Sequence, residues 1–289
     1  MTLELLANEH NGCGENPLWD ERRELLFWCD IPGEKIFAFD PKTHSHRLVA
    51  ELGRECGAFS LEESGDLLLL FVGDAALLDP DSGEVKPLAN GFLQDAERFN
   101  DCIACPDGSV FAGTVDWTQK TRGGLFHLHR GFENHRVTPV RTECSNGLGW
   151  TRDGRGLYWA DSSSRITWLF DFDPQTNELG EGREWLYTAD FTPDGLTTDG
   201  EGGVWIAYFN GPFVRHYDQN AGFIEQFDLP ARHVTSCIFG GEDLDELYIT
   251  TGGGKPDDAP DNPNGGFYRL KTSARGMREN RSKMGESLD

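Results

Sequence analysis

The sequence contains no apolar run long enough to cross a membrane. Its longest apolar run, residues 67–72, is far shorter than the ~20 residues that a membrane-spanning helix needs. Residues 1–11 contain neither the basic start nor the apolar stretch of a secretory signal peptide. We therefore expect a cytoplasmic protein that has no membrane partner.

Basic residues are also scarce. The chain has 26 Lys and Arg against 49 Asp and Glu, which gives a formal net charge of -23. A surface this acidic repels the phosphate backbone of nucleic acids and the head groups of anionic membranes. We therefore expect no nucleic-acid partner, and the charge by itself identifies no other partner.

The motifs of several common enzyme classes are absent. No serine stands in a G-x-S-x-G setting, which argues against a serine esterase with a nucleophile elbow. The seven cysteines are odd in number and irregular in spacing, so they do not indicate a disulfide framework. Cys102 and Cys105 form an isolated C-x-x-C, without the second pair or the nearby histidines that a zinc site needs.

What the sequence does contain is a repeat of six short, apolar, strand-like runs. Their central residues are Phe27, Leu69, Phe111, Tyr158, Trp205 and Tyr248. The steps between these residues are 42, 42, 47, 47 and 43 positions. A period of this length, made of strand-like segments, indicates several copies of one β-sheet unit.

A second series of strand-like segments follows the first. Its members are residues 35–40, 75–79, 124–129, 166–171, 213–218 and 266–270. Asp-Gly and Asp-Pro turns separate the segments, and none has the pattern of an amphipathic helix of normal length. Six four-stranded units can cover one another's apolar faces when they stand in a ring. We therefore predict an all-β fold, a six-bladed β-propeller with four-stranded blades.

The propeller is predicted to be a single domain over residues 1–270. The N-terminal run 3–6 is expected to complete the last blade and close the ring. Residues 271–289 are polar and of mixed charge, and we expect them to form a loosely attached polar tail.

The period also relates polar residues that lie far apart in the chain. Positions 11 or 12 residues before the six central residues are Glu15, Gly57, Asn100, Asn146, Asp194 and Ser236. Inner strands of a propeller run along its axis, so the four acids and amides among these residues should form a ring at one mouth of the channel. Buried carboxylates repel each other unless a cation neutralises them. Oxygen ligands suit calcium, magnesium or manganese, so the ring predicts a bound divalent cation. The alternative is that these acids and amides only cap turns.

Other residues gave weaker signals. His127 and His129 lie two apart on a strand and share a face, which permits metal binding, but we expect them to be solvated histidines of an outer strand. Trp19, Trp117 and Trp150 either line the mouth of the channel or pack between blades.

The segments around the predicted ring carry a family resemblance. Glu15 stands in C-G-E-N-P, Arg98 and Asn100 in R-F-N-D, Asn146 in S-N-G-L-G-W and Asp194 in T-P-D-G-L. In this order, and with the blade pattern from about residue 12 to 270, they resemble the senescence-marker-protein, gluconolactonase and luciferin-regenerating family. That resemblance implies a six-bladed propeller that hydrolyses sugar lactones with one divalent cation in its channel.

The same resemblance implies roles for individual residues. Glu15, Asn146 and Asp194 would be the metal ligands, Asp194 would also be catalytic, and Arg98 and Asn100 would contact the substrate. Asp116, in G-T-V-D-W, is an offset match to an acid that binds substrate hydroxyls in relatives. The family usually has glycine where this chain has Asn16, whose side chain is expected to narrow the pocket.

Our hypothesis from the sequence is therefore a metal-dependent sugar lactonase, a monomer or weak oligomer whose partner is a small sugar lactone. The cation would polarise the lactone carbonyl, and either Asp194 or a hydroxide at the cation would deliver the attacking water. Two alternatives share the fold and the cation. One is a hydrolase of other esters or organophosphates, and the other is a binding propeller without catalysis.

Overall fold

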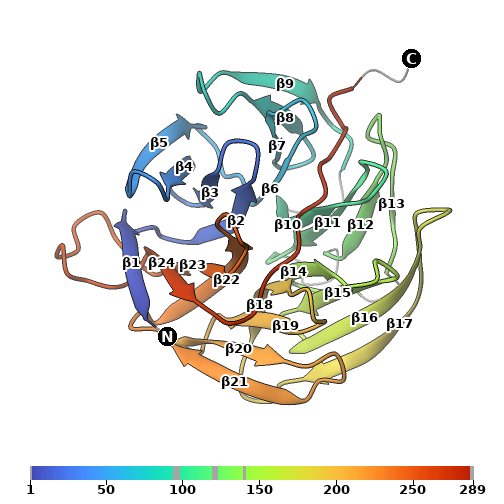
Figure 1. Ribbon diagram of the computed structural model, residues 1–289. Coiled ribbons are helices and arrows are strands. Elements are labelled where there is room, and N and C mark those ends of the chain that lie inside the picture. Colours follow the sequence, from blue (N-terminus) through green and yellow to red (C-terminus); the bar gives the residue numbers. More distant parts are fainter. Residues whose placement is uncertain (1, 94–97, 119–122, 139–140, 287–289) are drawn as a thin grey trace.

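The computed structural model describes residues 2–93, 98–118, 123–138 and 141–286. This part of the chain forms 24 strands, arranged in six four-stranded antiparallel sheets, and it contains no helix. The sheets stand around one axis as the blades of a propeller (Figure 1). The predicted six-bladed β-propeller with four-stranded blades is confirmed. The described residues accordingly offer no helix that could span a bilayer.

The first three blades contain the strands β2 to β13, and each begins at the axis with the strand that comes first in sequence. Their bounds are β2 (Gly14–Asp20), β3 (Leu25–Asp30), β4 (Lys35–Asp40), β5 (Ser45–Glu51), β6 (Ala58–Leu61), β7 (Leu67–Leu70), β8 (Ala75–Leu78), β9 (Val85–Ala89), β10 (Arg98–Ala104), β11 (Val110–Val115), β12 (Leu125–Leu128) and β13 (Asn134–Arg136).

The last three blades follow the same order, except that the N-terminal strand supplies the outermost strand of the sixth blade. Their bounds are β14 (Ser145–Trp150), β15 (Gly156–Asp161), β16 (Ile166–Asp173), β17 (Glu178–Tyr187), β18 (Pro193–Thr198), β19 (Val204–Tyr208), β20 (Phe213–Tyr217), β21 (Phe223–Asp228), β22 (His233–Gly240), β23 (Glu246–Gly252), β24 (Gly266–Lys271) and β1 (Leu3–Asn8).

The repeated apolar runs of the sequence are the second strands of the blades. Every residue of β7, β11, β15 and β19 is buried. Such continuous apolar runs occur because the neighbouring blades cover both faces of these strands. The outermost strands lack one neighbour, and β5 and β21 are accordingly exposed over most of their length.

The N-terminal strand closes the ring, as the sequence predicts. β1 pairs antiparallel with β24, with Leu3 opposite Leu270. Leu6 and Ala7 join the apolar cluster that contains Trp28 and Phe267, the rings of which stack with centroids 4.4 Å apart. This pairing joins the two ends of the propeller chain through both hydrogen bonds and apolar burial.

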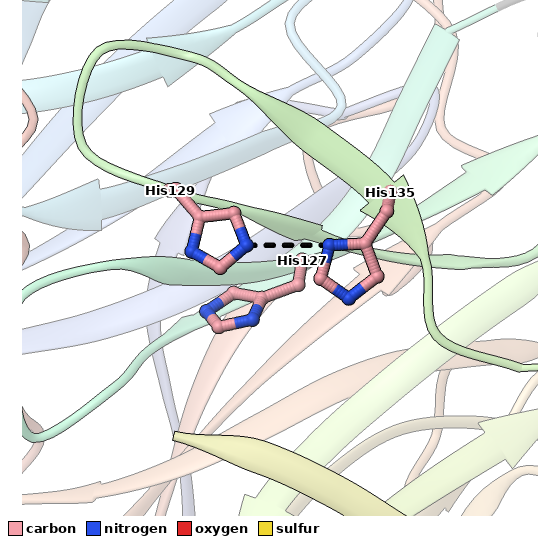
Figure 2. Close-up of side chains that lie close together, drawn as sticks. All are labelled: His127, His129 and His135. Carbon is pink, nitrogen blue, oxygen red and sulfur yellow. Dashed lines mark hydrogen bonds between the residues drawn. The ribbon is translucent and has the colours of Figure 1, made fainter. Parts of the chain in front are cut away.

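The expectation of solvated histidines is wrong for His127. His127 and His129 lie on and just after β12, the third strand of the third blade, and His127 is fully buried. Figure 2 shows these two rings beside His135 of β13. The ring of His127 packs on Phe111 of β11, with centroids 4.4 Å apart, which explains its burial.

The expectation of a loosely attached tail is also wrong for residues 272–286, while residues 287–289 lie outside the described part. The tail crosses the face of the propeller on which the inner strands end (Figure 1). Its backbone bonds to several blades: Gly276 N–H donates to Leu244 O, Ser282 N–H to Leu61 O and Lys283 N–H to Gly108 O, each at 2.8 Å. The backbone of the tail is therefore attached to several blades.

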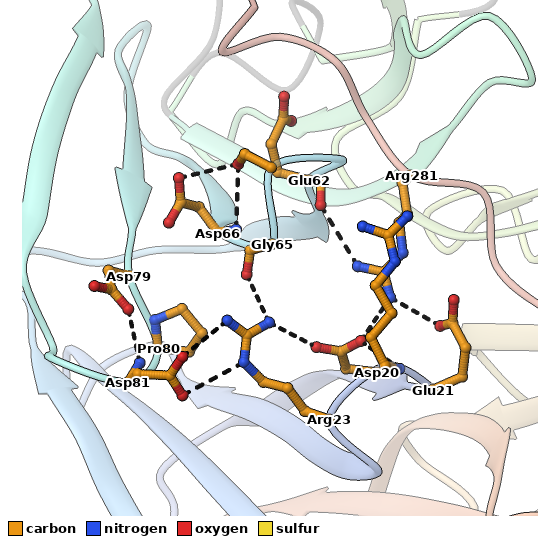
Figure 3. Close-up of polar contacts among 12 residues, drawn as sticks. Asp20, Glu21, Arg23, Glu62, Gly65, Asp66, Asp79, Pro80, Asp81 and Arg281 are labelled. Atoms are coloured by element: carbon orange, nitrogen blue, oxygen red, sulfur yellow. Dashed lines mark hydrogen bonds and ion pairs between the residues drawn. The ribbon is translucent and has the colours of Figure 1, made fainter.

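A buried arginine holds the tail to the first blade. Arg281 donates to Asp20 at 2.5 Å and to Glu21 at 2.9 Å, and its side chain is only 5% exposed (Figure 3). Asp20 is also paired with Arg23 at 3.0 Å. Burial raises the pKa of Asp20, but the hydrogen bonds and charges of Arg281 and Arg23 outweigh it, so that this pKa is lowered.

We predict that Arg281→Met destabilises the protein by ~3 kcal/mol, because removing one partner of a buried ion pair leaves its acids incompletely neutralised. The matched control is Arg278→Met, which removes the same charge from an exposed position of the tail. Urea unfolding of the two variants gives the difference. Equal stability of both variants would show that the tail contributes no stability through Arg281.

A second buried acid stabilises the fifth blade. Asp199 follows β18 and accepts hydrogen bonds from the backbone N–H groups of Glu201 and Gly203 and from the indole of Trp205 at 2.9 Å. His216 Nε2 lies 3.2 Å from Asp199 Oδ2, the oxygen that also accepts from Trp205. Burial raises the pKa of Asp199, but these partners outweigh burial and lower the pKa to about 2.

This lowered pKa predicts an acid-dependent loss of stability. The stabilisation is present above the unfolded-state pKa of about 3.9 and is lost as the pH falls through about 2, a difference of ~2 kcal/mol. Asp199→Asn should therefore be less stable than the native protein near neutral pH by about this amount, and the gap should close in acid. Urea unfolding near neutral pH and at a pH of about 2 measures this difference in stability. The control is Asp153→Asn, in an exposed turn of the preceding blade. A gap that does not depend on pH would contradict the prediction.

Candidate functional site at the channel mouth

A cavity lies at the end of the axis where the inner strands begin, opposite the tail. Its walls combine polar groups with aromatic and aliphatic side chains. The polar residues that line it include Glu15, Arg98, Asn100, Asn146 and Asp194. Five of the six predicted site residues thus face one cavity, although they come from four blades.

Equivalent positions on the inner strands bring these residues together. Glu15, Asn146 and Asp194 are each the second residue of their strands, β2, β14 and β18, and Asn100 is the third residue of β10. The strands are also very close at this point. A Cβ atom on Gly147 would lie 2.5 Å from the carbonyl oxygen of Asp194, and one on Gly195 would lie 2.6 Å from the Cα of Ser236. The glycines that follow Asn146 and Asp194 therefore permit the convergence.

The two carboxylates of the site are buried, and neither forms an ion pair with the described residues. Glu15 and Asp194 are each 4% exposed. Asp194 Oδ1 is buried and has no hydrogen-bond partner among the residues that the structure describes. Burial, and then the charge of Asp101, raise the pKa of Glu15 to about 8. Burial, and then the charge of Glu15, raise the pKa of Asp194 well above its usual range.

The amides are oriented by a chain of hydrogen bonds. Arg98 Nη1 donates to Asn100 Oδ1 at 2.6 Å, and Asn100 Nδ2 donates to Asn146 Oδ1 at 3.2 Å and to the carbonyl of Ser145 at 2.8 Å. Asn146 Nδ2 donates in turn to Ser162 Oγ at 3.1 Å. Asn146 Oδ1 accepts this one hydrogen bond from Asn100 and keeps its second lone pair for an electron-pair acceptor such as a cation.

These groups fit a divalent cation bound by oxygen. Two buried carboxylates, one of which has an orphaned oxygen, and an amide oxygen make a hard, anionic donor set. The thiols of Cys13 and Cys144 line the same cavity. Burial, and then the neighbouring carboxylates, raise the pKa of both thiols, which disfavours their thiolate forms.

Two residues that the sequence associates with the pocket lie outside it. Asp116 is buried behind the wall, where Thr118 donates to its carboxylate at 3.0 Å. Asn16 does not narrow the cavity: its backbone adopts a positive φ of 49°, and its amide donates to the carbonyl of Gly57 at 2.8 Å. Asp116 is offset in sequence from the matching acid of the relatives, and Asn16 has a left-handed backbone. Both side chains are therefore turned away from the cavity.

Aromatic residues form part of the wall. Trp117 is 53% exposed and Phe209 is 39% exposed, and both line the cavity. Trp19 and Trp150 are buried, and the indole of Trp150 donates to the carbonyl of Ala104 at 3.0 Å. Of the three tryptophans considered from the sequence, Trp117 is therefore the one at the mouth. Phe209 gave no sequence signal, because it comes directly after β19, outside the repeat.

The serines that follow β15 also reach the cavity. Ser162 and Ser163 line it, and Ser162 Oγ donates to the carbonyl of Pro193 at 2.6 Å. Ser162 therefore connects Asn146 to the residue before Asp194.

Known proteins resemble this chain in sequence, and solved structures resemble it in fold. Pentonolactonase XacC of Haloferax volcanii is 31% identical, with 98% of each chain covered. Regucalcin of Xenopus laevis is 31% identical over 87% of each chain. Among solved structures, a luciferin-regenerating enzyme matches with a TM-score of 0.85 at 24% identity, covering 98% of this chain and 99% of the other.

The structure of a calcium-binding regucalcin from Agrobacterium tumefaciens matches with a TM-score of 0.83 at 19% identity, with 96% of each chain covered. At these identities the two structures show the shared fold. The family model described as SMP-30/gluconolactonase/LRE-like region matches residues 13–253, which include the five predicted site residues that line the cavity. The chain therefore belongs to the SMP-30/gluconolactonase/LRE-like family.

Proposed function

We propose that this protein hydrolyses a sugar lactone to the free sugar acid, with one divalent cation held by Glu15, Asn146 and Asp194. The observation that carries this proposal is the orphaned oxygen of Asp194 beside the buried carboxylate of Glu15, in a cavity that also holds amide and guanidinium donors. The relative that is a pentonolactonase supports the choice of substrate class. The calcium-binding regucalcin structure is consistent with a cation at the site.

The cation would act as a Lewis acid on the lactone carbonyl and would be calcium, magnesium or manganese, in keeping with oxygen ligands. The chain's own residues would bind and orient the substrate. Arg98 and Asn100 present N–H groups and an amide to the cavity, which suit the ring and hydroxyl oxygens of a polyol. Their mutual hydrogen bond at 2.6 Å holds both side chains in place before the substrate binds.

Asp194 is the residue that we propose accepts the proton of the attacking water. Its Oδ1 faces no protein donor among the described residues, so this oxygen can accept a hydrogen bond from water. General-base catalysis by a positioned carboxylate typically contributes about 10²–10⁴ to the rate.

The aromatic wall would select for the less polar face of a sugar ring. Trp117 and Phe209 present exposed aromatic surface to the cavity. A sugar lactone has C–H groups that pack on such surfaces while its hydroxyls reach the polar residues opposite. The product is an acid, and the net charge of -23 would repel its new carboxylate and favour its release.

We predict that Asp194→Asn lowers the rate of aldonolactone hydrolysis about a hundredfold or more and weakens cation binding, because the amide is neutral and is not a base. Asp190→Asn, the same change at an exposed position four residues earlier, is the control and should keep native activity. Acid release in a pH-indicator assay with pentono- and hexonolactones measures the rate. Hydrolysis at the native rate by Asp194→Asn would refute the assignment of the base.

Chelation tests the cation and separates the alternatives. Activity should disappear after removal of divalent ions and should return when calcium, magnesium or manganese is restored separately. Aryl esters and phosphotriesters are assayed in parallel. Hydrolysis of these compounds without lactone hydrolysis would favour the broader esterase, and lactone binding without acid release would favour a binding propeller.

A further inference from the structure

Three histidines gather on the outer strands of the third blade, away from the channel. His127 belongs to β12, His129 follows it, and His135 belongs to β13 (Figure 2). His127 is directly opposite His135 in the antiparallel ladder. One ring nitrogen from each histidine can be chosen so that the three atoms lie within 4.8 Å of one another.

We propose that His127, His129 and His135 form a second metal site, distinct from the channel, for a transition-metal ion of the zinc class. This is the one group of three or more histidine, cysteine or acidic side chains with such spacing in the described part of the chain. Imidazole nitrogens suit zinc and its neighbours, whereas the channel offers oxygen donors. The two sites would therefore prefer different ions.

The hydrogen bonds of His127 leave one nitrogen ready to bind an ion. Ser109 Oγ donates to Asp107 Oδ1 at 2.6 Å and lies 2.8 Å from His127 Nε2. Because the hydroxyl proton of Ser109 is used on Asp107, Ser109 accepts from Nε2–H of His127. Nδ1 of His127 then carries a lone pair. It is buried and has no hydrogen-bond partner among the described residues.

Asp107 and Ser109 thus form the outer support that metal-bound histidines commonly have. A carboxylate or hydroxyl on one ring nitrogen fixes the tautomer and directs the other nitrogen at the ion. Ser109 is buried, and Asp107 also accepts from the backbone N–H of Ser109 at 3.0 Å. The support is therefore a rigid turn between β10 and β11.

The other two rings are already close enough for shared ligation. His129 Nε2 and His135 Nδ1 are 3.2 Å apart. Two nitrogens bound to one tetrahedral zinc ion at 2.0–2.1 Å would be separated by about 3.3 Å. Their present hydrogen bond would be replaced by two bonds to the ion, and the shared proton would move to the other nitrogen of its ring.

The surroundings of the histidines also favour a cation. Burial, and then the neighbouring histidines, lower the pKa of His127 to about 4, so its ring is neutral at physiological pH. Glu178, at the start of β17 in the next blade, acts on His135 with its negative charge. His129 is half-buried and His135 is exposed, so an ion can enter from solvent and keep a water as its remaining ligand.

Bound there, the ion would join β12 to β13, the two outer strands of the blade. β13 has only three residues and is the edge of its sheet. A metal that binds the folded state alone raises stability by RT ln(1 + c/Kd), where c is the free metal concentration, so the effect grows with c. The expected consequence is a melting temperature that rises with zinc and returns to its original value on chelation.

Cobalt titration of the metal-free protein tests the site. Cobalt in a four-coordinate nitrogen site absorbs visible light much more strongly than cobalt in a six-coordinate oxygen site. Strong visible absorption bands therefore indicate cobalt bound by the histidines. The native protein should show these bands at one equivalent, and zinc should displace them. The Asp194→Asn variant should show the same bands, since they do not depend on the channel.

The decisive variants are His135→Gln and His129→Gln, which lie at accessible positions and leave the buried ring in place. Each should lose the bands, lower zinc affinity at least tenfold, and abolish the zinc-dependent rise in melting temperature. His44→Gln, at an exposed histidine of the first blade, is the control and should retain all three. A melting temperature of each metal-free variant equal to that of the metal-free native protein shows that the variant is folded.

Two results would overturn the proposal: absence of the cobalt bands in the native protein, or unchanged zinc affinity in both histidine variants. Lactone hydrolysis by His135→Gln should match the native protein. A failure of the lactonase proposal would leave the cobalt bands unaffected, so the outcomes of the two proposals are independent.

Discussion

The pairing of β1 with β24 is the constraint on which the rest of this structure depends. Each blade leaves apolar faces that only its neighbours can cover, so an open ring would expose both the first and the sixth blade. Closure places Leu6 and Ala7 against Trp28 and Phe267, which joins the ends of the propeller through one apolar cluster. It also fixes the positions of the inner strands around the axis. The cavity therefore depends on a contact at the outer rim, far from any of its own residues.

The closeness of the inner strands explains how a site can be built from several blades. Gly147 and Gly195 allow the backbones of β14, β18 and β22 to approach within distances that a side chain would prevent. Asn146 and Asp194 precede these glycines, so the positions that permit close approach also direct the polar groups to the axis. A chain of hydrogen bonds, which runs from Arg98 through Asn100 and Asn146 to Ser162, then fixes the orientation of the two amides. Convergence thus comes from backbone geometry, and orientation comes from side chains.

The sequence predicted those parts of the protein that repeat. The period located the second strands around Phe27 and Tyr248, and the phase before them brought Glu15 and Asp194 to one cavity. It failed where a single non-local contact decides. The burial of Arg281 depends on Asp20, 261 residues away, and no periodic signal marks such a pair. His135 escaped notice because its place opposite His127 depends on the register of a short outer strand. The roles assigned to Glu15, Asn146 and Asp194 remain predictions, since a sequence pattern places ligands but does not establish what they bind.

The buried acids of the propeller separate into two groups, and the difference bears directly on the channel. Asp20 lies beside Arg23 and Arg281, Asp199 accepts several N–H bonds, and both have lowered pKa values. Glu15 and Asp194 are also buried but have raised pKa values, because burial raises both, in Glu15 against the charge of Arg98, and no ion pair is formed with either acid within the described residues. Burial alone therefore does not determine how these acids behave; the partner does. Arginines at the tail end and N–H groups in the fifth blade partner Asp20 and Asp199. Neither acid at the mouth forms an ion pair with the described residues, and Asp194 Oδ1 has no hydrogen-bond partner among them; the proposed cation site rests on this difference.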